Sequence, residues 1–284
     1  MHPVLEAIPV GRALVKAKHG LFLVLTNDLY IGKCLLGFGQ YSEGELNLLY
    51  QLASPNSAAI EVGSNIGALS IPMAKYLAGI NSQIYCYEPQ HEIFQLLNAN
   101  FALNAIANAF ASPVALGGQL GNAKALVIPD YGKFENYGGV AFGLVDQLCT
   151  DQGLVLMSTI DEEFKSVNQP ISLIKIDVEG SELQVLYGAQ EVIRKHRPNL
   201  YFENDRLEFS ERLLSFVGDL GYVLYWDFPL LVDRQNYFQS EVEPVLDGII
   251  SINILALPRE KNIPVANLKI VDDISWHPLR GQIS

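Results

Sequence analysis

Hydrophobic and polar residues change their spacing along the chain, and from about residue 58 onward two spacings alternate. Short runs rich in β-branched and aromatic residues are each followed by a stretch in which apolar residues recur at helical intervals. Strands that alternate with helices pair in parallel through right-handed crossovers. The pattern therefore predicts a layered α/β domain over residues 58–258. Its candidate strands are AAIEVG, QIYCYEP, LIKIDVEG, NLYFEN, YVLYWDF and SINILALP.

Helices can be bounded within this domain from their side chains. A helix is predicted over residues 91–104, where the apolar residues on one face are Ile93, Leu97 and Phe101. A second helix is predicted to begin at Ser181, because Ser181 and Gln184 match the capping box, and to end before Pro198. Residues 210–220 also show helical spacing.

Three segments do not follow the alternation. Glycines punctuate short β-prone runs between residues 116 and 159, which predicts a β-hairpin or meander inserted into the domain. Residues 1–57 are expected to form a lead-in of a helix and a hairpin that packs on the core. Residues 259–284 are expected to form a C-terminal tail.

Composition narrows the function classes. The chain has 284 residues, of which 49% are hydrophobic, and a formal net charge of −12. An acidic protein is poorly suited to grip nucleic acid phosphates or anionic lipid. We find no apolar run of the roughly 20 residues that a membrane span needs, and no signal-peptide pattern. The cysteines, Cys34, Cys86 and Cys149, are widely spaced, which is typical of reduced thiols and indicates no zinc site. We therefore expect a cytoplasmic protein without a membrane span or a nucleic acid partner. Its oligomeric state is left open.

The segment AAIEVGSNIG, residues 58–67, carries the strongest chemical signal. Gly63 lets the chain turn sharply after a strand, and Gly67 allows tight packing where the next helix starts. Backbone amides are then expected to point into the crevice at the carboxyl end of the strand. Two glycines at such a turn also occur without any ligand. Glu61, however, is an acid within a strand that should be buried, where an unpaired carboxylate is costly, so we expect it to face a cationic ligand.

A second acid follows the next strand. Glu88 lies 21 residues after Gly67, and an acid about 20 residues past a glycine turn is placed to hold a ribose diol. Asn65 occupies the position of the middle glycine that dinucleotide-binding proteins prefer. A pyrophosphate also gains nothing from Glu61, whereas a ligand with an ammonium and a sulfonium does. The two acids therefore favour S-adenosylmethionine over a dinucleotide.

The run LIKIDVEGSEL, residues 173–183, closes a third strand with Asp177 and Glu179. Strand ends at this edge of a parallel sheet face the ligand crevice, so Asp177 is expected near the group being transferred. It would orient or deprotonate an acceptor hydroxyl, and Glu203 at the end of the next strand is the second candidate. Asp177 could instead bind local amides in the turn. Asp177, Glu179 and Glu203 could also provide ligands for a divalent ion, but the spacing of the acids and histidines does not dictate a metal, and none is expected.

The chain from about residue 40 to residue 258 resembles the FkbM family of S-adenosylmethionine-dependent methyltransferases. The resemblance is carried by EVGSNIGALS, YCYEPQ, NANFALN, ALGGQLGN, NYGG, STIDEEF, IKIDVEGSELQVLYGA and RPNLYFE. It implies a Rossmann-like, seven-stranded, mostly parallel sheet with helices on both faces and an antiparallel last strand. It also implies O-methylation of a sugar, glycan or natural product, with S-adenosyl-L-methionine as donor and S-adenosyl-L-homocysteine as product.

The resemblance also implies roles for residues. The cofactor-binding set is Glu61, Gly63, Ser64, Asn65 and Gly67 around the methionine part, Glu88 with Pro89 at the ribose, Ala115 and Leu116 beside the adenine, and Asp177. The acceptor is expected to contact Glu179, Tyr137 and Trp226. Pro72 would kink a helix that started directly after Gly67, so that helix is expected to start near Ser70.

Two other functions stay open on the residues alone. One is an NAD(P)-dependent oxidoreductase on a similar sheet, and the other is a module that binds the cofactor without catalysis. The acceptor itself, a small molecule or a glycan, is not specified by any pattern in the chain.

Overall fold

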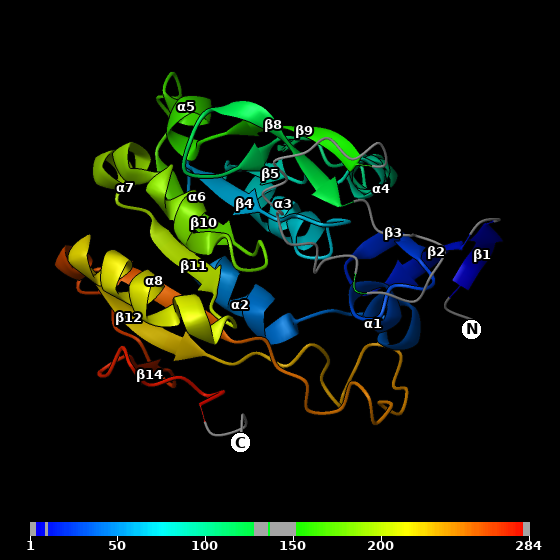
Figure 1. The fold of residues 1–284 in the computed structure, drawn as a ribbon. Coiled ribbons are helices and arrows are strands. Elements are labelled where there is room, and N and C mark those ends of the chain that lie inside the picture. Colours follow the sequence, from blue (N-terminus) through cyan, green and yellow to red (C-terminus); the bar gives the residue numbers. More distant parts are fainter. Residues whose placement is uncertain (1–3, 9–10, 128–135, 137–151, 281–284) are drawn as a thin grey trace.

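The computed structural model describes residues 4–8, 11–127, 136 and 152–280. Its central feature is an eight-stranded sheet with the strand order β14-β12-β13-β11-β10-β4-β5-β6 (Figure 1). The strands are β4 (Ala58–Val62), β5 (Gln83–Tyr87), β6 (Ala109–Ser112), β10 (Ile171–Ile176), β11 (Asn199–Glu203), β12 (Tyr222–Asp227), β13 (Asn253–Pro258) and β14 (Lys269–Ile270).

Strand directions in this sheet follow the prediction. Strands β6, β5, β4, β10 and β11 pair in parallel, whereas β13 runs antiparallel between β11 and β12. This arrangement confirms the Rossmann-like α/β fold with an antiparallel last strand. The eighth strand, β14, is an addition to the expected seven. It is a two-residue edge strand that pairs antiparallel with β12.

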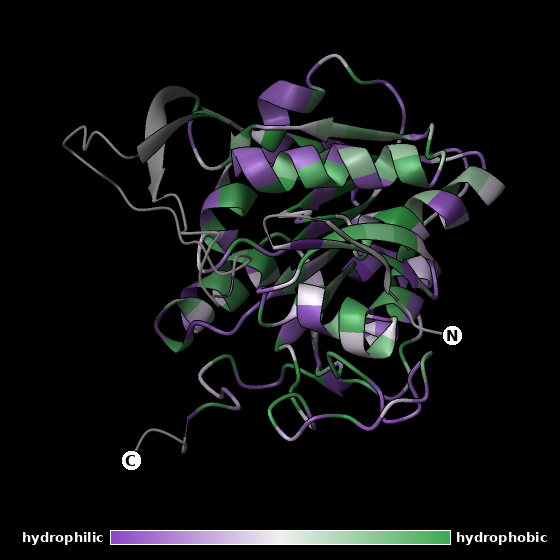
Figure 2. Ribbon diagram, turned by 90° about the vertical axis from the view of Figure 1, so that its right-hand side faces the viewer, coloured by the Kyte–Doolittle hydropathy of each residue, from purple (hydrophilic) through white to green (hydrophobic). Residues whose placement is uncertain are grey.

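Helices cover both faces of the sheet. One face carries α2 (Glu43–Leu52), α3 (Ser70–Gly79) and α4 (His91–Leu103), and the other carries α5 (Ile160–Phe164), α6 (Glu182–Tyr187), α7 (Gln190–His196) and α8 (Leu207–Asp219). Figure 2 shows green, hydrophobic and purple, hydrophilic residues alternating along these helices. Successive side chains of a strand point to opposite faces. Ala59 and Leu173 pack in the α2–α4 layer, so Glu61 and Lys175, two residues further on, point to that same face.

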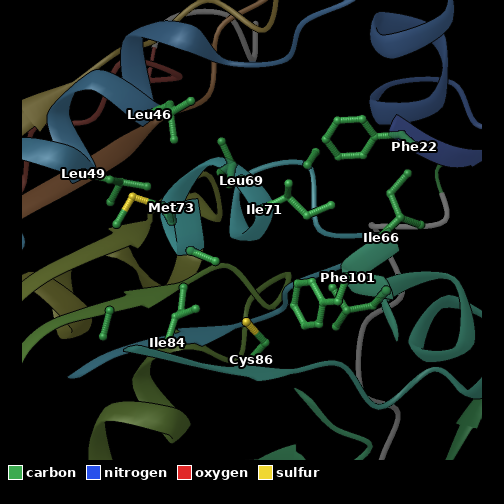
Figure 3. Packing of buried hydrophobic residues seen from close by; sticks show 14 of the residues in the cluster. Phe22, Leu46, Leu49, Ile66, Leu69, Ile71, Met73, Ile84, Cys86 and Phe101 are labelled. Carbon is green, nitrogen blue, oxygen red and sulfur yellow. The ribbon is translucent and has the colours of Figure 1, made fainter. Parts of the chain in front are cut away.

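The N-terminal segment packs in this layer. It forms a three-stranded antiparallel sheet of β1 (Val4–Ile8), β2 (Arg12–Ala17) and β3 (Gly20–Leu25), followed by α1 (Ile31–Phe38) and α2. Figure 3 shows Phe22 of β3 and Leu46 of α2 in one apolar cluster with Ile71 of α3 and Phe101 of α4. This shared core fixes α2 against the sheet, beside the strand ends that carry the acids.

A second three-stranded sheet follows β6 in the chain. It contains β7 (Ala115–Leu116), β8 (Gly121–Val127) and β9 (Gln152–Ser158), in the order β7-β9-β8. β8 and β9 pair antiparallel, as expected of a hairpin. The β-prone run GVAFG between them and Tyr137 lie outside the described residues.

The helix predicted from Ser181 differs from the expectation. The Ser181 side chain makes no capping hydrogen bond, and the carboxylate of Glu182 instead accepts the amides of Val178 and Gly180, each at 3.1 Å. The helix is also interrupted at Gly188, where a Cβ would lie 2.1 Å from the carbonyl oxygen of Gly117. The close approach of the loop after β7 therefore divides the stretch into α6 and α7. The helix starts expected at His91 and near Ser70 are confirmed, since α4 begins at His91 and α3 at Ser70. The helical stretch expected at residues 210–220 is α8, which begins earlier, at Leu207.

Among the helices of the described residues, none is long and apolar enough to cross a membrane.

Candidate active site

A cavity of about 370 Å³ opens at the carboxyl ends of β4, β5, β10 and β11. Its lining comes from four parts of the chain. The strand ends and the loops that follow them contribute Glu61, Gly63, Ser64, Asn65, Ala68, Leu69, Glu88, Lys175, Asp177, Glu179, Glu203, Asp205 and Arg206. The N-terminal segment contributes Tyr30, Ile31 and Tyr41, the connection between β12 and β13 contributes Leu231 and residues 249–252, and Asn136 also lines the cavity.

The turn after β4 has the backbone that its glycine was expected to allow. Gly63 has a φ of +84°, and a Cβ there would lie 1.8 Å from the carbonyl oxygen of Asp177. The amides do not all point into the crevice, which corrects the expectation. Those of Gly63 and Ser64 donate to the carbonyl of Tyr87, at 2.9 and 3.1 Å. Glycine at position 63 therefore serves the close approach of β4 to β10.

Glu88 lies at the bottom of this turn and is 4% exposed. Its Oε2 accepts the amide of Asn65 at 3.1 Å, and its Oε1 accepts the amide of Gln90 at 2.9 Å. Burial raises the pKa of Glu88 to about 7, although both backbone donors act in the opposite direction. The carboxyl is thus fixed in orientation and available to further hydrogen-bond donors in the cavity.

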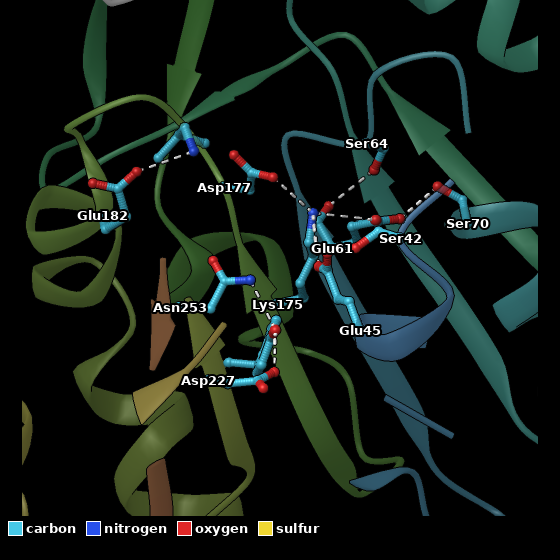
Figure 4. A network of polar contacts seen from close by, with 12 residues as sticks. Ser42, Glu45, Glu61, Ser64, Ser70, Lys175, Asp177, Glu182, Asp227 and Asn253 are labelled. Carbon is cyan, nitrogen blue, oxygen red and sulfur yellow. Dashed lines mark hydrogen bonds and ion pairs between the residues drawn. The ribbon is translucent and has the colours of Figure 1, made fainter. Parts of the chain in front are cut away.

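Lys175 is the centre of a buried polar network (Figure 4). Its Nζ lies 3.1 Å from Asp177 Oδ2, 3.7 Å from Glu61 Oε1 and 4.0 Å from Glu45 Oε1. Lys175 and Glu61 are also direct partners in the pairing of β10 with β4. Burial opposes the charged form of Lys175, yet the surrounding carboxylates raise its pKa above the ordinary value. The ammonium therefore stays charged inside the protein.

The two glutamates of this network lie on different elements, Glu61 on β4 and Glu45 on α2. Glu61 also accepts a hydrogen bond from the hydroxyl of Ser70, and burial raises its pKa. Glu45 belongs to α2, is 3% exposed, and accepts a hydrogen bond from Ser42 at 2.9 Å. Burial raises the pKa of Glu45 to about 7. The cation that Glu61 was expected to face is thus present within the protein, in Lys175.

Asp177 and three further carboxyl groups gather where β10 and β11 end. Asp177 keeps 38% of its side chain exposed, beside Lys175. Glu179, which has a φ of +53°, forms an ion pair with Arg206, and Asp205 lies 3.2 Å from the same guanidinium. Burial, followed by the charge of Asp177, raises the pKa of Glu203 well above its ordinary value.

The sequence of residues 61–224 matches the family model described as the Methyltransferase FkbM domain. This stretch contains the turn after β4, Glu88 and the acids at the ends of β10 and β11. The chain belongs to the FkbM methyltransferase family. Among curated proteins, none matches its sequence.

Solved structures resemble this FkbM-family protein at low identity. Methyltransferase FkbM from Methylobacillus flagellatus KT is 16% identical with a TM-score of 0.42, and the match covers 75% of this chain but 50% of that one. A SAM-dependent methyltransferase from Agrobacterium tumefaciens is 8% identical with a TM-score of 0.49, covering 90% of this chain and 72% of that one. Aeropyrum pernix fibrillarin, in complex with natively bound S-adenosyl-L-methionine, is 14% identical with a TM-score of 0.41, covering 87% and 94%.

Several residues expected at the site of the FkbM-family protein lie elsewhere. Trp226 is 2% exposed and packs against Phe228, Trp276 and His277, so the structure places it in the core and not on the acceptor side. Ala115 and Leu116 are buried in β7, and they, Pro89 and Gly67 are absent from the cavity lining. At Gly67, a Cβ would lie 2.9 Å from the side chain of Leu97 on α4. The glycine is therefore explained by the close packing of this turn against α4.

Other residues of the site were missed from the sequence. Lys175 stands inside an apolar strand, and the argument applied to Glu61, that a buried charge needs a partner, would have singled it out too. Glu45, Tyr30 and Tyr41 carry no signal of this kind, because only the fold brings the N-terminal segment to the cavity.

Proposed function

We propose that this FkbM-family methyltransferase uses S-adenosyl-L-methionine, bound across the ends of β4 and β5, to methylate a hydroxyl of a sugar, glycan or natural product. One observation carries the proposal. Glu61 and Glu88, which stand at or just beyond the ends of neighbouring parallel strands, line the same cavity. The product of the reaction is S-adenosyl-L-homocysteine.

The residues present fit this donor in charge and in hydrogen bonding. Each oxygen of Glu88 accepts one backbone amide and keeps a lone pair that can accept a ribose hydroxyl. Among the described residues that line the cavity, acids outnumber bases, since Lys175 and Arg206 are the only bases beside six carboxyl groups. Such an excess favours a ligand that brings an ammonium and a sulfonium. The volume of about 370 Å³ lies within the range of roughly 300–1,000 Å³ typical of small-molecule sites.

When bound, the sulfonium supplies an activated methyl group, so the protein has mainly to position the acceptor and exclude water. We assign the positioning of the acceptor hydroxyl to Asp177. Lys175 fixes Asp177 Oδ2 from within the sheet, and the exposed part of the carboxylate is left to accept a hydrogen bond from the acceptor. Glu203 lies in the same cavity and is the second candidate.

The acceptor class is supported by the walls beside these acids. Tyr30 and Tyr41 from the N-terminal segment, with Leu231 and Ile250 from the connection before β13, give the cavity an apolar and aromatic side. A molecule that presents several hydroxyls and one apolar face suits such a mixture. The net charge of −12 supports a small acceptor over a nucleic acid.

Calorimetry with S-adenosyl-L-homocysteine and with NAD tests the proposal. We expect saturable binding and a raised Tm with S-adenosyl-L-homocysteine, and neither with NAD. Glu88→Gln should weaken that binding by roughly ten- to a hundredfold, because a charge-assisted hydrogen bond contributes about 1.5–3 kcal/mol. Glu211→Gln, an exposed change on α8, is the matched control and should bind as the wild type does. Stabilisation by NAD alone would overturn the proposal.

A further inference from the structure

Three carboxylates form a compact cluster at the acceptor end of the cavity. Glu179 follows β10, and Glu203 and Asp205 stand at and just after the end of β11, the neighbouring parallel strand. One carboxylate oxygen from each residue lies within 4.8 Å of the other two. All three residues line the cavity, so the cluster is accessible to a small ligand.

One oxygen of this cluster is left without a partner. Glu203 Oε2 is buried, with less than 1 Å² accessible, and makes no hydrogen bond with any described residue. Burying a carboxylate oxygen in this way is costly, and almost all such atoms in folded proteins are paired. Because Glu203 is one of the residues that line the cavity, an unpaired oxygen on its carboxylate points to a positively charged ligand.

Arg206 supplies only part of the charge that the cluster needs. Its guanidinium contacts Glu179 Oε2 and Asp205 Oδ2, and among the described residues it forms no ion pair with Glu203. With all three carboxylates ionised, the cluster and Arg206 together carry two negative charges. A divalent cation would neutralise that remainder.

The donor atoms select the kind of cation. The cluster offers carboxylate oxygens and neither histidine nor cysteine. Hard divalent cations such as Mg²⁺ and Mn²⁺ prefer this set, whereas zinc favours nitrogen and sulfur ligands. Mg²⁺ takes six ligands, so three carboxylates would leave positions for water or for oxygens of the acceptor.

We infer that Glu179, Glu203 and Asp205 form a binding site for one hard divalent cation, of the Mg²⁺ or Mn²⁺ type, at the acceptor end of the cavity. From the sequence, a divalent ion at Asp177, Glu179 and Glu203 was only an unfavoured alternative and Asp205 was not considered, because ligands on two separate strands show no characteristic spacing. The inference makes Glu203 a ligand and not a proton acceptor. That the cation would hold an acceptor oxygen rests on the proposed function, but cation binding itself does not.

Calorimetric titration of the full chain with Mg²⁺ and with Mn²⁺, after treatment with a chelator and without any nucleoside, tests the inference. We expect one saturable site per chain with a dissociation constant no weaker than about 1 mM, the weak end for protein Ca²⁺ sites. Glu203→Gln and, separately, Asp205→Asn should each weaken binding at least tenfold. Glu211→Gln is the control and should bind the cation as the wild type does.

The two proposals can fail separately. S-adenosyl-L-homocysteine affinity is measured on the same variants, and Glu203→Gln should leave it within about twofold while also showing that the variant is folded. Absence of a saturable Mg²⁺ or Mn²⁺ site in the wild type would overturn the inference, and so would cation binding that Glu203→Gln leaves unchanged. Loss of nucleoside binding alone would count against the proposed function only.

Discussion

Replacing Lys175 with methionine should destabilise the protein in a strongly pH-dependent way. The substitution keeps the length of the side chain but removes the ammonium that contacts Glu45, Glu61 and Asp177 at 4.0, 3.7 and 3.1 Å. Glu45 and Glu61 are both buried, so neither can exchange the lost partner for bulk water. The variant must therefore bury uncompensated charge or bind protons.

The magnitude follows from these distances. At an effective dielectric constant of about 20, two unit charges 4 Å apart attract by about 4 kcal/mol. The net loss is smaller than this, because part of the attraction in the wild type offsets the cost of burying Lys175. The buried carboxylates of the variant can also bind protons, which costs about 1.4 kcal/mol for each unit between the pH and their pKa. Breaking a buried pair by removing one partner typically costs about 3–5 kcal/mol, and we expect a loss in that range at pH 8.

The sign of the pH dependence follows from Glu45. Its pKa of about 7 in the folded protein exceeds its ordinary value of 4.5. Folded protein therefore binds the proton more tightly than unfolded chain, and this contribution to stability is present at low pH and lost as pH rises through about 7. Removing Lys175 raises the pKa of Glu45 and Glu61 further. The penalty of the substitution should thus be smaller by 1 kcal/mol or more at pH 5.5 than at pH 8.

Urea unfolding followed by circular dichroism at both pH values measures this difference. Lys165→Met is the matched control, because Lys165 is 62% exposed and pairs with Glu162 on the surface. Its loss should stay below about 1 kcal/mol at either pH. A loss for Lys175→Met of less than about 1 kcal/mol at pH 8, or the same loss at both pH values, would refute the reasoning.

Three further outcomes are expected from the site. Asp177→Asn should lower kcat by on the order of 10²–10⁴ while leaving S-adenosyl-L-homocysteine affinity within about twofold, and unchanged turnover would remove Asp177 from the mechanism. Burial raises the pKa of Glu88 to about 7, and hydrogen bonds from ribose hydroxyls favour its ionised form. Glu88 should therefore release a proton when S-adenosyl-L-homocysteine binds. The affinity for S-adenosyl-L-homocysteine should rise as pH rises from about 5 to about 8. Calorimetry in two buffers of different ionisation enthalpy checks this, and equal proton release by Glu88→Gln would contradict it. Gly63→Ala should lower the free energy of unfolding by more than 1–2 kcal/mol, since its Cβ would meet Asp177 at 1.8 Å in a left-handed backbone. Thermal unfolding should show Gly37→Ala, on an open helix face, to be neutral or slightly stabilising.

The fold could be predicted from the sequence because its signals are local. Six strands of the main sheet (β4, β5, β10, β11, β12 and β13) lie in or overlap the short runs named from the sequence, and the helix 91–104 has a regular apolar face, whereas β6 and β14 were not among the candidate strands. The prediction of a capping box at Ser181 was wrong because Glu182 takes the place of Ser181 as the hydrogen-bond acceptor. Glu182 reaches the amides of Val178 and Gly180 itself, so the capping box is not used.

The site was harder to predict because much of it depends on which strands are neighbours. Glu61 lies near the end of β4 and Glu88 directly follows β5, the next strand, so their common cavity could be foreseen. The pairing of Lys175 with Glu61 requires β10 to lie beside β4, although more than 100 residues separate them in sequence. Glu45 reaches the same network from a helix that precedes the sheet altogether.

The apolar walls of the cavity have an implication for how such enzymes diversify. Tyr30, Tyr41, Leu231 and Ile250 all fall outside residues 61–224, the part that defines membership of the family. Under the proposed function, the apolar walls offered to the acceptor thus lie in stretches of the chain that flank the acids assigned to the donor. Exchanging these two flanking stretches between family members is then a direct route to redirecting a methylation.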